Sequence, residues 1–205
     1  MTPAPRLSRK QREFLQRKGE ILDAAEAVFA AKGFLSATME EIAQRAEFAV
    51  GTLYRFFASK NSLYEETVRS RIERMETELN GSLEADESPH EKIASYFRCR
   101  LNQFWENPRF FRLFYQGTSA MVMETRAGFL PEIMSRYEKL LRDVEQAFRE
   151  GIAKGQFRPV EPRLLTTVLE GTIRSYVVRL SREVNPVRNL KEEETLLDLF
   201  QSGAT

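Results

Sequence analysis

The stretch TMEEIAQRAEFAVGTLYRFFASKNSL, residues 38–63, combines two short helical patterns with a tight joint between them. Thr38 and Glu41 have the spacing of a capping box, in which the threonine hydroxyl accepts an orphan amide and the glutamate bonds back to the cap residue. The joint follows at residues 47–49, and the second pattern begins at Val50. A short helix, a tight joint and another short helix predict a helix-turn-helix unit.

Longer helical patterns lie on both sides of this unit. On the amino-terminal side, apolar residues recur at helical spacing, and Gly33 has the form of a helix stop. We therefore predict a helix over residues 12–32. On the carboxyl side, Ser59 can cap a long amphipathic helix that reaches about Asn80.

The second short helix has the composition of a helix that lies in the major groove. Such a helix needs small residues at its start, polar or methyl-bearing groups on its exposed face and large apolar residues behind. Leu53 and Phe57 can anchor the inner face. The Thr52 side chain can read a base edge or bind phosphate, whereas Tyr54 and Lys60 can hold backbone phosphates. The residues expected at the DNA are Val50, Gly51, Thr52, Tyr54, Arg55 and Lys60.

Residues 38–63 resemble the DNA-binding signature of the TetR family of transcriptional regulators. The shared pattern consists of Thr38, Ile42, Ala43, Ala46, Gly51, Thr52, Leu53, Tyr54, Phe57, Ser59, Lys60 and Leu63. Thr38 belongs to this pattern and joins the expected DNA-binding residues. A weaker resemblance covers residues 155–180 and 196–204. The resemblance implies a ligand-responsive regulator, most often a repressor, that binds a palindromic DNA operator as a homodimer.

Three positions depart from the family pattern. Glu47 stands where a glycine is usual, so either its backbone takes an unusual conformation or the turn changes. Ala49 stands where a serine often caps the recognition helix. Phe56 stands where a tyrosine or histidine is frequent, and its ring cannot hydrogen-bond phosphate. The fold is expected to survive these changes, while the contacts at these positions are left open.

The remainder of the chain is also predicted to be helical. Helix starts are expected at Ser88-Pro89, Asn107-Pro108 and Glu161-Pro162, because proline suits the first helical position. The other expected boundaries are a polar linker at 81–87, a division at Gly128 and Pro131, ends at Gly155 and Asn185-Pro186, and a last helix over 191–200. An all-α protein of about nine helices follows. Residues 1–62 are expected to form the DNA-binding domain, with a basic arm at 1–12, and residues 63–205 a ligand-binding and dimerisation domain.

Aromatic residues are concentrated between Tyr96 and Tyr115, where eight of the 22 aromatic side chains occur. Such density can supply apolar walls for a bound molecule, and nearby arginine and glutamine side chains can orient it. A plain aromatic core is the alternative, and the family resemblance favours a cavity for a small apolar or aromatic effector. The expected ligand-binding residues are Tyr96, Arg100, Gln103, Phe104, Phe111, Phe114 and Tyr115.

The predicted helix that begins at Glu161-Pro162 is apolar around more of its circumference than one intramolecular face requires. The last helix adds further leucines, and Gly171 permits close approach of another helix. Two copies of this helix pair can form an isologous four-helix interface. Burial of both helices within one monomer is the alternative. The expected dimerisation residues are Leu165, Val168, Thr172, Leu196, Leu197 and Phe200.

Composition and charge restrict the remaining classes of function. The chain is 42% hydrophobic and 30% charged and has no apolar run of membrane-spanning length, so a cytoplasmic globular protein is expected. Residues 1–20 carry a net charge of +4, in a chain whose total is +1. This basic end suits contact with phosphate, and a solvated tail is the alternative.

Catalysis and metal binding find little support in the sequence. Cys99 and His90 are the single cysteine and the single histidine, which leaves no ordinary metal-ligand set, and no cofactor motif is recognisable. No nucleophile with an adjacent base can be identified, so an enzyme is not expected. A DNA-binding protein of the same fold that responds to no ligand is the main alternative to a ligand-responsive regulator.

Overall fold

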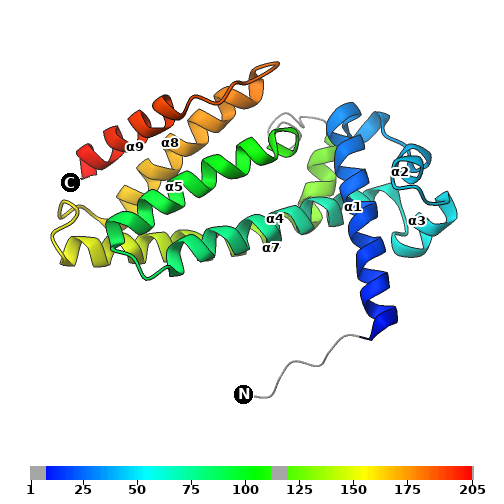
Figure 1. Cartoon of the computed structure of the whole chain (residues 1–205), viewed down its shortest axis with the longest axis horizontal. Helices are drawn as coiled ribbons and strands as arrows, with labels where there is room; N and C mark the ends of the chain where they lie inside the picture. Colours follow the sequence, from blue (N-terminus) through cyan, green and yellow to red (C-terminus); the bar gives the residue numbers. More distant parts are fainter. Residues whose placement is uncertain (1–7, 112–119, 205) are drawn as a thin grey trace. The chain divides into compact units, whose positions relative to one another are not determined.

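The computed structural model describes residues 8–111 and 120–204, and within them the regular structure is α-helical (Figure 1). The described residues form two compact units. The first contains residues 8–70 and 120–126, and the second contains residues 71–111 and 127–204. The predicted all-α class is therefore confirmed.

The first unit contains the predicted helix-turn-helix. It consists of α1 (Arg9–Ser36), α2 (Met39–Arg45), α3 (Val50–Phe56), the first part of α4 (Lys60–Glu84) and the start of α7 (Ala120–Ala153). Helix α2 packs against both α1 and α3. The core of this unit includes the fully buried side chains of Ile21, Ala25, Phe29, Ile42, Leu53 and Leu63.

Helix α1 begins earlier than predicted because Ser8 caps it. The Ser8 hydroxyl accepts a hydrogen bond from the Gln11 amide, and the Gln11 side chain accepts one from the Ser8 amide. At the other end, Gly33 has φ 76°, a conformation that favours glycine. The predicted stop at Gly33 is confirmed, and one further helical turn follows it before Ala37.

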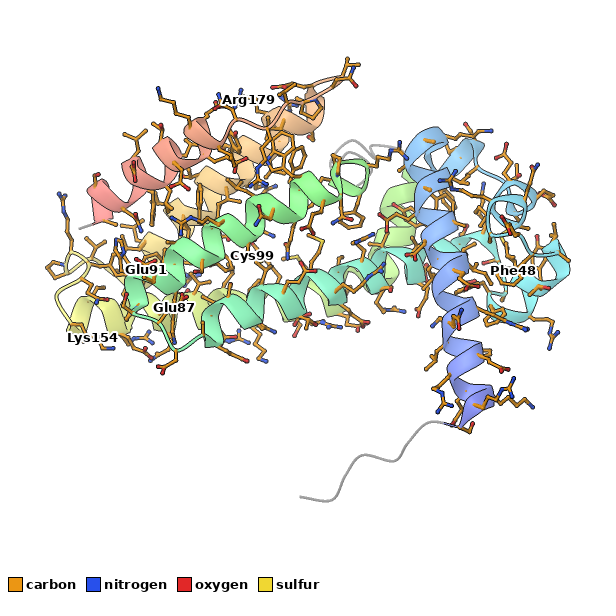
Figure 2. All side chains as sticks on the ribbon, in the orientation of Figure 1. Phe48, Glu87, Glu91, Cys99, Lys154 and Arg179 are labelled. Atoms are coloured by element: carbon orange, nitrogen blue, oxygen red, sulfur yellow. The ribbon has the colours of Figure 1, made fainter. Side chains whose placement is uncertain are left out.

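The joint between α2 and α3 takes an unusual backbone conformation. Glu47 has φ 59°, which for a residue with a Cβ costs about 1 kcal/mol. Of the two outcomes expected at Glu47, the unusual backbone is therefore the one observed. Phe48 follows in the joint, where its amide bonds to the Ala43 carbonyl at 3.0 Å (Figure 2). Helix α3 then begins without a side-chain cap from Ala49, as expected.

The second unit is a bundle of longer helices. It contains the rest of α4 and most of α7, together with α5 (Pro89–Glu106), a helical turn at 108–111, α8 (Pro162–Arg182) and α9 (Leu190–Ala204). Helix α5 packs against α8, which also contacts α9 (Figure 1). The buried core includes Ile93, Tyr96, Phe97, Phe104, Val144, Phe148 and Leu169.

Two predicted helix boundaries are wrong. Helix α4 continues through Gly81 to Glu84, since a single glycine inside a helix costs only about 1 kcal/mol. Gly128 and Pro131 do not separate two helices, because α7 runs through both positions. Proline removes its own amide from the hydrogen-bond ladder, and the bonds on either side can persist. The predicted end near Gly155, where φ is 69°, is confirmed.

Candidate DNA-binding surface and ligand cavity

Helix α3 presents to the surface the face that the sequence assigns to DNA. Leu53 is fully buried and fixes the helix to the core of the first unit. Gly51, Tyr54 and Arg55 are exposed, and Thr52 is half-buried like Val50. The small and polar side chains of α3 are thus accessible, whereas Leu53 is not and Phe56 is half-buried. This arrangement suits a helix that enters a groove of duplex DNA.

Thr38 caps α2 as the sequence predicts. Its hydroxyl oxygen accepts a hydrogen bond from the Glu41 amide at 3.2 Å, and Glu41 bonds back to the Thr38 amide. A hydrogen bond from Lys32 lowers the pKa of the Glu41 carboxyl, which therefore stays charged. Thr38 is exposed, and its hydroxyl proton is not needed for the cap.

Lys60 has a structural role that the sequence reasoning missed. Its ammonium group donates hydrogen bonds to the carbonyls of Leu35 and Ala37, at 3.2 and 2.9 Å. It also lies over the Phe34 ring, 4.7 Å from the ring centroid. These carbonyls lie at the carboxyl end of α1, where a cation is favoured. Lys60 thus ties the first turn of α4 to the end of α1.

We expect Lys60→Ala to lower the free energy of unfolding by about 1 kcal/mol, because two charge-assisted hydrogen bonds are lost at a partly exposed site. Urea denaturation measures this loss. Lys32→Ala is the matched control, since Lys32 forms an exposed ion pair with Glu41, and should cost clearly less. Equal costs for the two variants would contradict the structural role of Lys60.

The second unit contains a cavity of about 300 Å³. That volume lies at the lower end of the range for small-molecule sites. Apolar side chains from α4, residues 108–111 and α7 form most of its wall, and charged groups from α4, α5, α7 and α8 complete it. Its lining residues are Ile72, Met75, Glu76, Leu79, Arg100, Phe110, Phe111, Met134, Arg136, Tyr137, Leu140, Glu170 and Arg174.

Glu170 is the centre of the polar part of this wall. One carboxylate oxygen accepts from the Tyr96 hydroxyl at 2.6 Å, and the other accepts from Tyr137 at 2.5 Å and from Arg100 at 3.3 Å. The Glu170 carboxylate is mostly buried, as is the Arg100 guanidinium. Burial raises the pKa of Tyr96 well above its usual value, so its hydroxyl remains a donor to Glu170.

A second charged group on the cavity wall is already paired. Arg136 donates to Glu76 at 2.6 Å and to Glu73 at 2.9 Å. Burial lowers the pKa of Arg136, but the two carboxylates raise it by more. The guanidinium therefore stays charged. The wall therefore carries two paired arginines, Arg100 and Arg136, together with Arg174 and large apolar areas.

The residues that the sequence assigned to the ligand divide into three groups. Arg100 and Phe111 line the cavity. Tyr96, Gln103 and Phe104 are buried and are not among the residues that line it, so their assignment to the ligand stays a prediction. Phe114 and Tyr115 lie outside the described residues. Glu170 and Tyr137 were missed, although a lone carboxylate within the apolar run of α8 was a usable signal.

Gln103 instead supports the inner side of α4. Its amide nitrogen donates to the Met75 carbonyl at 2.8 Å and to the Glu78 side chain at 3.0 Å. Cys99 lies one turn before it on α5 (Figure 2). Burial raises the pKa of the Cys99 thiol to about 11, so the thiol stays protonated and unreactive near neutral pH.

The predicted dimerisation residues also divide. Leu165, Leu197 and Phe200 are buried within the protomer, as the monomer-core alternative expects. Thr172 and Leu196 are half-buried. Val168 is 50% exposed, and two residues that were not singled out are also exposed apolar side chains on these helices, namely Leu164 and Leu199. Leu164, Val168 and Leu199 are thus exposed apolar side chains of α8 and α9, and dimerisation through these helices stays a prediction.

None of the described helices is long and apolar enough to cross a membrane. In the same part of the chain, no three histidine, cysteine, aspartate or glutamate side chains are grouped so that they could hold a metal ion.

Comparison with known proteins finds similarity to bacterial transcriptional regulators. The family model for bacterial regulatory proteins of the tetR family matches residues 21–67. The HTH-type transcriptional repressor KstR2 of Mycobacterium tuberculosis is 24% identical over 143 residues, which cover 70% of each protein.

Solved structures extend the likeness over most of the chain. The ketosteroid transcriptional regulator KstR2 of Mycobacterium tuberculosis matches with a TM-score of 0.72 and 24% identity, covering 92% of this chain and 95% of that one. The regulator FadR of Bacillus subtilis, in complex with stearoyl-CoA, matches with a TM-score of 0.72 and 20% identity, covering 91% and 99%. At these identities the structures establish a shared fold.

Proposed function

The chain belongs to the TetR family of bacterial regulatory proteins, and on that premise we propose that it is a dimeric repressor, released from a palindromic operator by a small effector. It is a transcriptional regulator and not an enzyme. The observation that carries the ligand response is the cavity in the second unit, whose wall combines apolar side chains with the hydrogen-bonded Glu170.

The exposed face of α3 supports the assignment of DNA contacts. Thr52 can read a base edge in the major groove, and the Tyr54 hydroxyl can hold a phosphate. Lys60 uses two of its three ammonium protons on carbonyls, which leaves one for a phosphate oxygen. Thr38 is exposed at the start of α2, where its hydroxyl proton is available to a phosphate oxygen. In two copies related by a two-fold axis, these surfaces would read an inverted repeat.

The cavity wall supports an effector that is mainly apolar. Ile72, Leu79 and Leu140 offer surfaces whose burial by a ligand is favourable. The charge of Arg100 is compensated by Glu170, whereas Arg174, one turn later on α8, is a basic group of the wall that can meet a polar or anionic group of the effector. Hydrogen-bonding groups on the effector can meet the Glu170 carboxylate or the Tyr137 hydroxyl.

Helix α4 supports a link between effector and DNA, because it contributes to both units. Its first turns supply Leu63 and Tyr64 to the core of the first unit, and its later turns supply Ile72, Met75 and Leu79 to the cavity wall. An effector that favours one position of α4 would bias the position of the first unit. By linkage, its effect on operator affinity must equal the effect of the operator on effector affinity.

The proposal is tested in two steps. Selection of duplexes from a random pool should enrich an inverted repeat with half-site centres roughly 34–36 Å apart, or a multiple of that distance. The affinity for each candidate effector is then measured with and without the selected operator, and the affinity for the operator is measured with and without the effector. The factor by which the operator changes effector affinity should equal the factor by which the effector changes operator affinity. Failure to enrich an inverted repeat would exclude the dimeric operator, and an effector whose affinity ignores the operator would favour the ligand-independent alternative.

A variant with a filled cavity tests effector binding independently of DNA binding. Leu140→Phe adds volume to the cavity wall and should weaken effector binding at least tenfold while the protein still binds its operator. Leu35→Phe makes the same substitution at an exposed site of the first unit and should change neither affinity. If Leu140→Phe leaves effector affinity unchanged, the effector binds elsewhere.

A further inference from the structure

The start of α1 is fastened to the end of α3 by two aromatic rings. Phe14 and Phe56 are stacked, with ring centroids 4.7 Å apart and an interplanar angle of 26°. Phe56 is the last residue of α3, and its ring also neighbours that of Phe57. Phe14 remains 52% exposed, so the pair lies at the surface of the first unit. The phenylalanine that departs from the family pattern at position 56 thus has a partner in this chain.

The first turns of α1 have few other reasons to be ordered. Residues 9–17 are all exposed, so they bury little surface in the core of the unit. A helical segment of that length is marginal in water unless something holds it. The Ser8 capping box closes the start of this segment, and the Phe14–Phe56 stack fastens it to α3.

Helical spacing places two basic side chains on the same stripe of α1 as Phe14. Lys10 lies four residues before Phe14 and Arg17 three residues after it, and both spacings put side chains on one helix face. That face contacts α3 through Phe14. Lys18 shares the face but is occupied by an ion pair with Glu66 at 2.5 Å.

The charges on this stripe are available to a partner. Within the described part of the chain, neither Lys10 nor Arg17 has a hydrogen-bond or ion-pair partner. Arg9 lies on another face of α1 and is paired with Glu13. Two uncompensated cations beside the helix that faces DNA attract the polyanion that this helix approaches.

We propose that residues 9–18 form a second DNA-contacting surface, in which Lys10 and Arg17 bind phosphates next to the bases that α3 reads. The Phe14–Phe56 stack is the positioning element that keeps this surface against α3. The inference rests on the proposed DNA-binding function and extends it to a helical arm with its own anchor. Phosphate contacts of this kind add affinity without sequence preference.

The test measures operator affinity as a function of salt concentration in the full-length protein. Each lost phosphate contact reduces the slope of log K against log salt by about 0.9. The double variant Lys10→Ala/Arg17→Ala removes two contacts in each of two protomers, so its slope should fall by about 3.6. Its preference among operator sequences should stay the same. Lys154→Ala/Arg163→Ala removes two exposed charges from the second unit and serves as the charge-matched control.

The anchor is tested with Phe14→Ala. This variant should bind the operator more weakly and show a smaller salt slope, as Lys10→Ala/Arg17→Ala does, because residues 9–18 fray when the stack is removed. In combination with Lys10→Ala/Arg17→Ala it should cause little further loss, since both changes act through one surface. Leu15→Ala is the matched control: Leu15 is 50% exposed, next in sequence, and turned away from the stripe.

The outcomes separate this inference from the proposed function. A parent protein that binds no selected duplex would refute the DNA-binding function itself. A parent that binds, with an unchanged salt slope in Lys10→Ala/Arg17→Ala, would overturn the second surface alone. A Phe14→Ala variant that behaves like Leu15→Ala would remove the anchor from the proposal.

Discussion

Val168→Glu should convert the protein into a monomer that binds its operator weakly. Val168 is half exposed on α8, and Leu164 one turn earlier is exposed as well, which leaves an apolar stripe for a second copy to cover. An isologous interface would bury the new carboxylate twice, once from each protomer. At about 2 kcal/mol for each unpaired charge, the dimer dissociation constant should rise by about three orders of magnitude. Sedimentation equilibrium measures this constant directly.

The same substitution at a second valine separates assembly from general effects of charge. Val187 is 82% exposed in the connection between α8 and α9, so Val187→Glu should leave the dimer intact. Leu199 on α9 is the other exposed apolar residue of the proposed surface, and Leu199→Glu should act like Val168→Glu. A parent protein that is monomeric at micromolar concentration, or a Val168→Glu dimer of parental affinity, would refute this interface.

Much of the first unit could be predicted from sequence because its signals are local. The capping box at Thr38, the glycine stop at Gly33 and the strained joint at Glu47 each depend on a few neighbouring residues. The predicted division at Pro131 is wrong because the local signal there is ambiguous. A proline in the middle of a helical pattern can end the helix or be tolerated within it, and local sequence does not decide between the two.

For the predicted dimerisation residues of α8 and α9, the sequence does not separate side chains that face the protomer core from those that face outward. Leu164 and Leu165 are adjacent on α8, and Leu196 and Leu197 are adjacent on α9, so apolar side chains occur on more than one face. Helical periodicity identifies such a helix as broadly apolar without saying which stripe turns inward. In the structure, Leu165 and Leu197 are buried and Leu164 is exposed.

The cavity could be predicted only in part, because its polar centre is assembled from distant positions. Tyr96 and Arg100 were found through the aromatic density of α5, but their partner Glu170 is 74 and 70 positions away. Tyr137 is 33 positions from Glu170. No local pattern encodes contacts at such separations, and α8 had been assigned to dimerisation. Of the groups that meet Glu170, Tyr96 is fully buried and Arg100 is mostly buried.

Glu170→Leu should therefore lower the free energy of unfolding by about 3 kcal/mol, a large effect for one side chain. The substitution removes the carboxylate beside the mostly buried Arg100 and takes the acceptor from the Tyr96 hydroxyl, whose residue is fully buried. Tyr137→Phe deletes a single hydrogen bond of the same group and should cost about 1 kcal/mol. Denaturant unfolding of the three proteins measures both values.

Helix α9 offers a carboxylate with the same kinds of partner in a different environment. Glu192 accepts hydrogen bonds from Arg179 at 2.6 Å and from Tyr176 at 3.3 Å, but its side chain is 40% exposed. Water can replace both partners there, so Glu192→Leu should cost less than about 1 kcal/mol. If Glu170→Leu costs no more than Glu192→Leu, then burial does not set the energy of the Glu170 group. In that case the cavity wall would be wet, and the mainly apolar effector would lose its physical basis.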